Sequence, residues 1–137
     1  MDGKIKVISN KGWHNKYFAN ETQIGGEQPI DVTYTILALE KFYKVFKKDE
    51  YKQKATIAFN WFLGENHLHQ IVYNPCTSGC YDGVEEHNVN LNQGAESTVS
   101  YLMARLIMEK YVDEKEKTTK KQEGYPKKKS KNQTIVI

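Results

Sequence analysis

The sequence has only two cysteines and no long uninterrupted apolar run. Two cysteines cannot form the dense disulfide framework of small secreted domains. The apolar stretches fall far short of the roughly 18 residues that a membrane-spanning helix needs. The first residues, MDGKIKVISNKGW, lack the continuous apolar segment of a secretory signal peptide. These absences predict no membrane span, and they favour a cytoplasmic location.

Basic residues are in modest excess, with a formal net charge of +3 over 137 residues, but they are unevenly placed. Residues 113–137 hold eight lysines and four acids, so residues 1–112 are close to neutral. A nucleic-acid surface needs basic residues spread over a folded face. We therefore expect no nucleic-acid partner. The low-complexity segment 113–137 is predicted to be a disordered charged tail, because it cannot bury a core.

Three segments have the apolar periodicity of helices. The first covers residues 29–46 and ends at a charged turn, with a proline in its first turn. The second covers about 50–63, and Gly64 is typical of a helix C-terminus. The third begins near residue 94 and continues to about 112, with Asn92 as the expected N-cap.

Two long irregular segments, residues 9–28 and 65–92, lead into the first and third helices. If successive helices pack antiparallel, the first and third helices run in the same direction. Their N-termini and both irregular segments then lie at one end of the molecule, while the short turn at 47–49 lies at the other. Because binding residues concentrate on loops held by a rigid scaffold, we expect function at the loop-bearing end.

Carboxylates lie at this expected functional end. Asp31 and Glu96 each fall in a first helical turn, where the helix dipole favours an ionised carboxylate. Asp82, in a Cys-Tyr-Asp-Gly turn, is a third candidate. Paired carboxylates across a cleft are what glycoside hydrolysis requires. The alternative is that acids in a first helical turn are ordinary capping residues.

Aromatic residues gather in the same loops. Flat rings beside amide and carboxylate side chains suit a sugar, whose C–H face stacks while its hydroxyls form hydrogen bonds. The alternative is that the rings anchor the long loops onto the helices. The residues concerned are Trp13, His14, Tyr17, Phe18, Tyr73 and Tyr81.

A zinc site is suggested by Cys76 and Cys80, with His67, His69 and His87 nearby in the sequence. However, the C-x3-C and H-x-H spacings do not match structural zinc patterns, and a second Cys pair is lacking. We expect two reduced cysteines and no metal. The sequence also has no phosphate-binding glycine loop or nucleotide fingerprint, so we expect no cofactor.

Five segments together resemble a bacterial protein family. They are GWH at 12–14, QPID at 28–31, AFNWFLG at 58–64, GCYDG at 79–83 and NLNQGAEST at 90–98. Members of this family have an α/α-toroid domain of the six-hairpin-glycosidase type, and they are often labelled glycosyltransferases. The resemblance covers roughly residues 8–110, and the NLNQGAEST segment is its most specific part.

The resemblance implies an all-α fold in which residues 1–112 are the C-terminal part of a toroid, with about three helices and two long loops on one rim. It implies a saccharide ligand, and as protein partners a glycosyltransferase or the missing part of the toroid. Toroids need more helices than this chain has, so we expect uncovered apolar sides and no catalysis by the isolated chain. The residues in the characteristic segments are the Trp13 loop, Gln28, Asp31, Asp82, Asn92, Gln93 and Glu96.

Three functional hypotheses remain open. In the first, the parent protein is a carbohydrate-active enzyme, acting by transfer or hydrolysis, with catalytic residues among Asp31, Asp82 and Glu96. In the second, the chain is a non-catalytic module that binds glycan or supports a glycosyltransferase, with Trp13 and Tyr73 among its contact residues. In the third, the chain is an inactive truncated remnant.

Overall fold

The computed structural model describes residues 9–11 and 24–123, with the side chains of the last helix described as far as Tyr111. The described chain is mainly helical and carries four very short strands. The helical elements are α1 (Pro29–Phe46), α2 (Asp49–Asn60), the 3-10 turn η1 (Trp61–Leu63) and α3 (Ala95–Glu123). The strands are β1 (Tyr73–Asn74), β2 (Gly79–Cys80), β3 (Gly83–Val84) and β4 (Val89–Asn90).

The first two helices confirm the expected boundaries. Pro29 occupies the first turn of α1, where a missing N–H is tolerated. The helix ends at Phe46, and the C-cap residue Lys47 has a left-handed backbone (φ 56°) and donates its N–H to the Tyr43 carbonyl at 2.8 Å. Helix α2 continues into η1, which stops at Gly64 with φ 107°. A residue without a Cβ adopts this conformation at low cost.

Helix α3 differs from its prediction at both ends. It begins at Ala95, so that Gly94 rather than Asn92 stands at the N-cap position. It ends at Glu123, eleven residues beyond the predicted end at Val112. The added segment is rich in Glu, Lys and Gln, which are good helix formers, with opposite charges four residues apart. Part of the predicted tail is therefore helical, and residues 124–137 lie outside the described chain.

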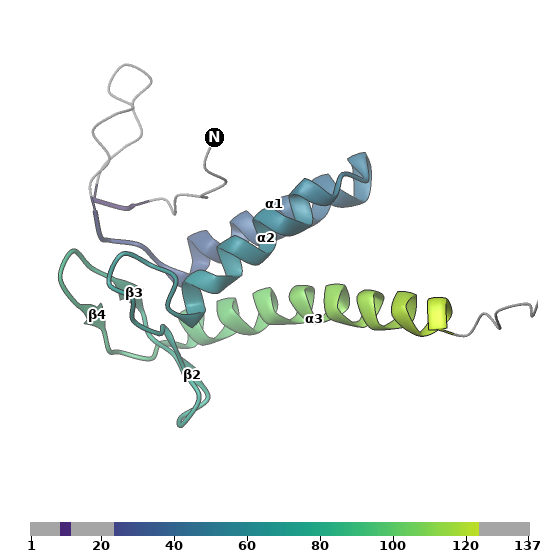
Figure 1. The fold of residues 1–137 in the computed structure, drawn as a ribbon. Coiled ribbons are helices and arrows are strands. Elements are labelled where there is room, and N and C mark those ends of the chain that lie inside the picture. Colours follow the sequence, from purple (N-terminus) through teal and green to yellow (C-terminus); the bar gives the residue numbers. More distant parts are fainter. Residues whose placement is uncertain (1–8, 12–23, 124–137) are drawn as a thin grey trace, which may run out of the picture.

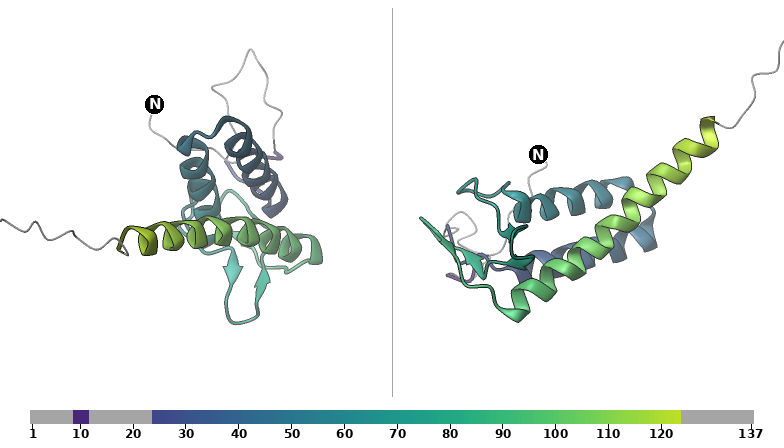
Figure 2. Two further views of the ribbon diagram at one scale, coloured as in Figure 1. Left: turned by 90° about the vertical axis from the view of Figure 1, so that its right-hand side faces the viewer. Right: turned by 90° about the horizontal axis from the view of Figure 1, so that it is seen from below.

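The helices have the predicted directions. Helices α1 and α2 are antiparallel neighbours, and α3 runs the same way as α1 (Figure 1). Two further views show α3 crossing the α1–α2 pair obliquely and extending beyond it (Figure 2). The starts of α1 and α3 thus share one end of the molecule with the strands, and we call this end the rim.

The segment between η1 and α3 forms two hairpins, where the sequence predicts a long loop. Strands β1 and β2 pair antiparallel with Tyr73 opposite Cys80, and β3 and β4 pair with Val84 opposite Val89. Glu27 extends the second hairpin through a bridge to Val84. The all-α prediction is therefore incomplete. Strands of two residues are too short to show alternation in a sequence.

The core lies where the three helices meet under the hairpins. Val32 and Ile36 of α1 and Phe62 of η1 are fully buried or nearly so. Tyr101 of α3 stacks on Tyr73 with ring centroids 4.1 Å apart and meets Phe62 edge-on at 5.3 Å. This aromatic stack joins the first hairpin to the helices, so the hairpins have a fixed position over the helix starts.

Small side chains let α1 and α3 approach closely. The Thr33 hydroxyl donates to the Ser100 carbonyl at 2.8 Å, and both residues are buried. Ala104 lies one turn further along α3 and is fully buried. The contact fixes the relative position of the two helix starts that form the rim.

Several large apolar side chains of the described residues are exposed to solvent. On α3 they include Val99, Leu102, Met103 and Leu106, and on α1 they include Tyr34. None of the helices in the described residues is both long and apolar enough to pass through a membrane.

Candidate functional site

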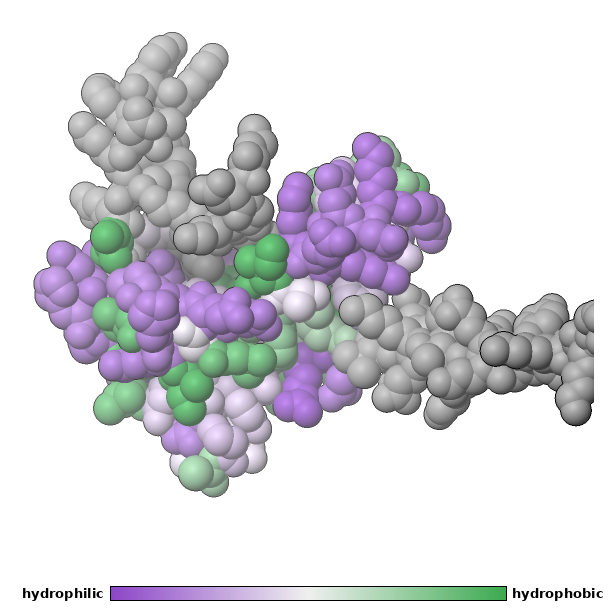
Figure 3. Space-filling model, in the orientation of Figure 1, coloured by the Kyte–Doolittle hydropathy of each residue, from purple (hydrophilic) through white to green (hydrophobic). Residues whose placement is uncertain are grey.

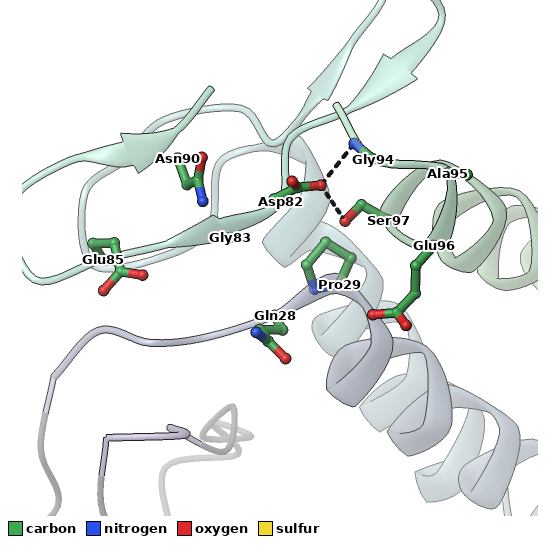
Figure 4. Close-up of a pocket in the computed structure, with 10 residues that line it drawn as sticks. All are labelled: Gln28, Pro29, Asp82, Gly83, Glu85, Asn90, Gly94, Ala95, Glu96 and Ser97. Atoms are coloured by element: carbon green, nitrogen blue, oxygen red, sulfur yellow. Dashed lines mark hydrogen bonds between the residues drawn. The ribbon is translucent and has the colours of Figure 1, made fainter. Parts of the chain in front are cut away.

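A pocket of about 390 Å³ opens at the rim, between the starts of α1 and α3 and the second hairpin. Figure 4 shows the side chains around it. Most of them carry amide, carboxylate or hydroxyl groups. The polar lining residues are Gln28, Asp82, Glu85, Asn90, Glu96 and Ser97.

Asp82 is the best-held carboxylate of the pocket. One carboxylate oxygen, Oδ1, accepts from the Gly94 backbone N–H at 2.8 Å and from the Ser97 hydroxyl at 2.7 Å. The Asp82 N–H itself lies within hydrogen-bonding distance of the carbonyls of Asn90 (3.1 Å) and Asn92 (2.8 Å). A carboxylate at a helix start satisfies backbone donors that have no partner within the helix. Asp82 therefore fixes α3 against the hairpin.

Gly94 allows the Asp82 carboxylate to approach this closely. A Cβ at position 94 would lie 2.8 Å from Asp82 Oδ1, closer than real Cβ atoms come to other heavy atoms. Any side chain at this position would displace the carboxylate from the start of α3. The absence of a side chain at Gly94 thus leaves room for the carboxylate of Asp82, which lies twelve residues upstream of Gly94 in the sequence.

Glu96 presents a different kind of carboxylate. It lies in the first turn of α3, is exposed and lines the pocket. Its side chain forms no hydrogen bond or ion pair with the other described residues. Figure 4 shows its side chain on the side of α3 that faces α1, near Gln28 and Pro29. Its oxygens are accordingly available to a ligand.

Asp31 lies apart from these two carboxylates. It is half-buried in the first turn of α1, and its Oδ2 accepts from the Asn10 side-chain amide at 3.1 Å. It is not one of the residues that line the pocket. The structure therefore brings Asp82 and Glu96 to one pocket and leaves Asp31 outside it.

The predicted amide residues fall in different places. Gln28 is exposed and lines the pocket directly in front of α1. Asn92 is exposed and contributes its backbone carbonyl to Asp82. The Gln93 Oε1 accepts from the Thr77 hydroxyl at 2.8 Å, which ties the first hairpin to the segment before α3. Only Gln28 of these three reaches the pocket with its side chain.

The aromatic candidates lie outside the pocket lining or outside the described residues. Tyr73 is half-buried against Tyr101, so one ring face is already covered. The Tyr81 hydroxyl accepts from the Asn74 side-chain amide at 2.9 Å within the first hairpin. Both rings anchor hairpin segments, as the alternative interpretation expects. Trp13 and His14, with Tyr17 and Phe18, belong to the part of the chain that is not described.

Glu27 holds several segments together beside the pocket, and the sequence does not predict this role. Its Oε2 accepts from the Trp61 indole N–H at 2.6 Å, and its Oε1 lies 3.6 Å from His67 Nδ1. Its backbone exchanges hydrogen bonds with Val84 at 3.1 and 2.9 Å. Glu27 thus joins the second hairpin to η1 beside the pocket. No local pattern marks it, because its partners are far away in the sequence.

The pocket is acidic on balance. Asp82, Glu85 and Glu96 line it, and none of the lining residues in the described part of the chain is a lysine or an arginine. Glu85 is partly neutralised by Lys11, whose Nζ lies 2.9 Å from Glu85 Oε2. A lining of this kind disfavours an anionic ligand and accepts a neutral ligand that is rich in hydroxyl groups.

The cysteines have contrasting environments. Cys76 is exposed at the first hairpin and Cys80 is buried in β2. Burial, and secondarily the negative charge of Asp82, raise the pKa of the Cys80 thiol to about 12. Its thiol is therefore protonated at neutral pH. In the described part of the chain, His, Cys, Asp and Glu residues form no group of three or more that could hold a metal ion.

Comparison with known proteins adds no relative: no protein-family model matches the chain, and no curated protein matches it either.

Proposed function

We propose that this chain is part of a carbohydrate-active protein and that its rim pocket binds a neutral saccharide. The observation that carries the proposal is the pocket of about 390 Å³ lined by carboxylates, amides and a hydroxyl. Sites for small polar ligands are concave and hold a few convergent polar groups on a rigid scaffold. The resemblance of five segments to a toroid family supports a sugar as the ligand.

Glu96 and Gln28 are the proposed contact residues. Both are exposed and line the pocket. A carboxylate accepts hydrogen bonds from two sugar hydroxyls, and an amide both accepts and donates. Asp82 is a positioning residue, because one of its oxygens already holds Gly94 and Ser97.

A glycan array probed with the chain tests this proposal, followed by titration calorimetry on the saccharides that bind. We expect neutral oligosaccharides to bind and those carrying sialic acid or uronic acid to bind weakly or not at all. Glu96→Gln replaces one acceptor oxygen by an NH2 donor and removes the charge, and Gln28→Ala removes the amide. We expect each to weaken binding by about tenfold, or about 1.4 kcal/mol.

The matched control is Glu65→Gln, which changes an exposed acid away from the pocket in the same chemical way. It should bind as the wild type does. If no glycan binds, or if Glu65→Gln weakens binding as much as Glu96→Gln, the rim pocket is not a saccharide site. Far-ultraviolet circular dichroism shows whether each variant keeps its helices.

Catalysis is the second candidate function, favoured by two carboxylates, Asp82 and Glu96, that line one pocket. Glycoside hydrolysis uses a carboxyl pair on either side of the bond that breaks. In a longer protein that contains these segments, Glu96→Gln would then abolish turnover without abolishing folding. Binding that persists together with unchanged turnover would contradict catalysis and leave the non-catalytic module, which could also support a glycosyltransferase.

We also propose that the three helices belong to an α/α toroid. The parallel α1 and α3, with their starts at one rim, support this arrangement, because alternate helices of such a ring run in the same direction. The coding DNA upstream of the first codon provides a test. An in-frame series of helical hairpins is expected there, whereas unrelated sequence would favour the truncated remnant.

A further inference from the structure

A second concave surface lies between α1 and α3, next to the rim pocket. It has a volume of about 160 Å³ and is mostly apolar, and we call it the groove. The apolar lining residues are Ile30, Tyr34 and Leu37 of α1 and Val99 and Met103 of α3. They recur at spacings of three and four, so each helix presents a continuous apolar strip to the groove.

These strips are left open to solvent. Tyr34 is 64% exposed and Val99 is 53% exposed, and Leu106 continues the strip on α3 with 60% of its surface exposed. Single exposed apolar residues are ordinary, but a contiguous strip on two adjacent helices is typical of an interaction site. A helix of a partner molecule would bury it by packing into the groove.

The two helix strips that line the groove carry opposite charges at their two ends, and the basic end lies beyond the groove itself. Glu96 lies at the end near the rim. At the other end are Lys41, four residues beyond Leu37 on the α1 strip, and Lys110, four residues beyond Leu106 on the α3 strip. The Lys110 side chain is 62% exposed, and its Nζ lies 3.8 Å from Glu40 Oε1. The strip is therefore acidic at one end and basic at the other.

We propose that a second copy of this chain covers the groove, related by a twofold axis that makes the facing helices antiparallel. A twofold interface places the same surface of each copy against the other, with its ends exchanged. The Glu96 end of one copy then meets the Lys41 and Lys110 end of its partner, twice per dimer. A surface with one acidic and one basic end is complementary to itself only in this antiparallel arrangement.

This inference does not rest on the proposed saccharide site, although Glu96 lines both the pocket and the groove, and the two proposals are tested by separate measurements. Sedimentation equilibrium of the wild-type chain over a concentration series is the first measurement. The mass should rise from 15.9 kDa toward twice that value as the concentration increases. Met103→Asp puts a charge at the centre of the strip, and it should raise the dimer Kd by at least about tenfold.

Ile71→Asp is the matched control, because Ile71 is 51% exposed in the segment before β1, outside the groove. It should dimerise like the wild type. A wild-type chain that stays monomeric at every concentration overturns the proposal and leaves the groove to a different protein. Equal loss of association in Ile71→Asp and Met103→Asp also overturns it.

A charge exchange tests the antiparallel arrangement. Glu96→Lys alone, and the double variant Lys41→Glu with Lys110→Glu, should each be largely monomeric, because like charges then meet at both ends. An equimolar mixture of the two should form mixed dimers with a Kd near that of the wild type. A mixture that stays monomeric, while both variants keep their helical circular dichroism, overturns the antiparallel pairing.

Discussion

The rim pocket and the groove are neighbours that share Glu96, but the pocket lining is mostly polar and the groove lining is mostly apolar. At the rim, several polar side chains have partners within the chain: Asp82 accepts from Gly94 and Ser97, and Gln93 accepts from Thr77. In the groove, large apolar side chains such as Tyr34 and Val99 are left uncovered. Hydrogen bonds within the chain hold the rim in place, whereas the apolar side chains of the groove are exposed to solvent.

The difference shows how a preformed polar site can stand beside an incomplete apolar face. Hydrogen bonds at the rim are local to two hairpins and two helix starts, so they form within one chain. Apolar strips on helices need another layer to exclude water. On the face seen in Figure 3, hydrophobic and hydrophilic residues are mixed at the end that holds the hairpins.

The largest effect is expected from the core beneath both regions. Ile36 is fully buried on α1, two positions from the exposed Tyr34. Ile36→Ala removes buried apolar volume and should lower the free energy of unfolding by about 2–5 kcal/mol. Urea denaturation followed by circular dichroism measures it. A loss below about 0.5 kcal/mol would mean that α1 does not pack as described.

The second largest effect is expected at the rim, where Asp82 accepts hydrogen bonds from the start of α3. Asp82→Ala leaves the Gly94 N–H and the Ser97 hydroxyl without their acceptor, and it should cost about 1–3 kcal/mol in unfolding free energy. Ser97→Ala removes only one of these two bonds and should cost less. The same urea titration compares the variants. Equal stability of Asp82→Ala and the wild type would show that the carboxylate does not hold α3.

The third effect is the response of Cys80 to pH and thiol reagents. The pKa of Cys80 is raised from 9.0 to about 12 in the folded chain, so the folded state holds its proton more tightly. This contribution to stability is complete below about pH 9 and is lost as the pH rises toward 12. A Cys80→Ala variant should lose less stability over that range, as measured by thermal unfolding.

Thiol labelling provides an independent readout of the same contrast. At about pH 8, a disulfide reagent should modify Cys76 rapidly, because this thiol is exposed to solvent. Cys80 should react only after urea unfolds the chain. Rapid modification of both thiols in the native protein would contradict the burial of β2.

The smallest effect is expected in the groove. Tyr34→Ser removes a ring that is 64% exposed, so in dilute, monomeric protein the unfolding free energy should change by no more than about 0.5 kcal/mol. The same substitution should weaken self-association measured by sedimentation. A large loss of monomer stability would mean that the Tyr34 ring packs within the chain. The groove would then not be an uncovered surface.

The sequence allowed the first two helices to be located, because Pro29 and Gly64 mark a start and an end that depend on local backbone conformation. The short turn at 47–49 also predicted that α1 and α2 are antiparallel. The common direction of α1 and α3 followed only from the assumption that the third helix packs antiparallel to the second. The hairpins could not be predicted from two-residue strands. The predicted end of α3 at Val112 is wrong, because a helix of good helix formers continues to Glu123 after its apolar periodicity stops.

Among the candidate site residues, the sequence by itself determined that Glu96 would stand in a helix start and Asp82 in a turn. Only the tertiary structure decided that these two share a pocket and that Asp31 lies outside it. The physical reason is that a helix start and a turn are fixed by contacts between near neighbours. The pocket instead depends on a hydrogen bond from Gly94 to Asp82 across twelve residues, and on Glu27 joining segments from three parts of the chain.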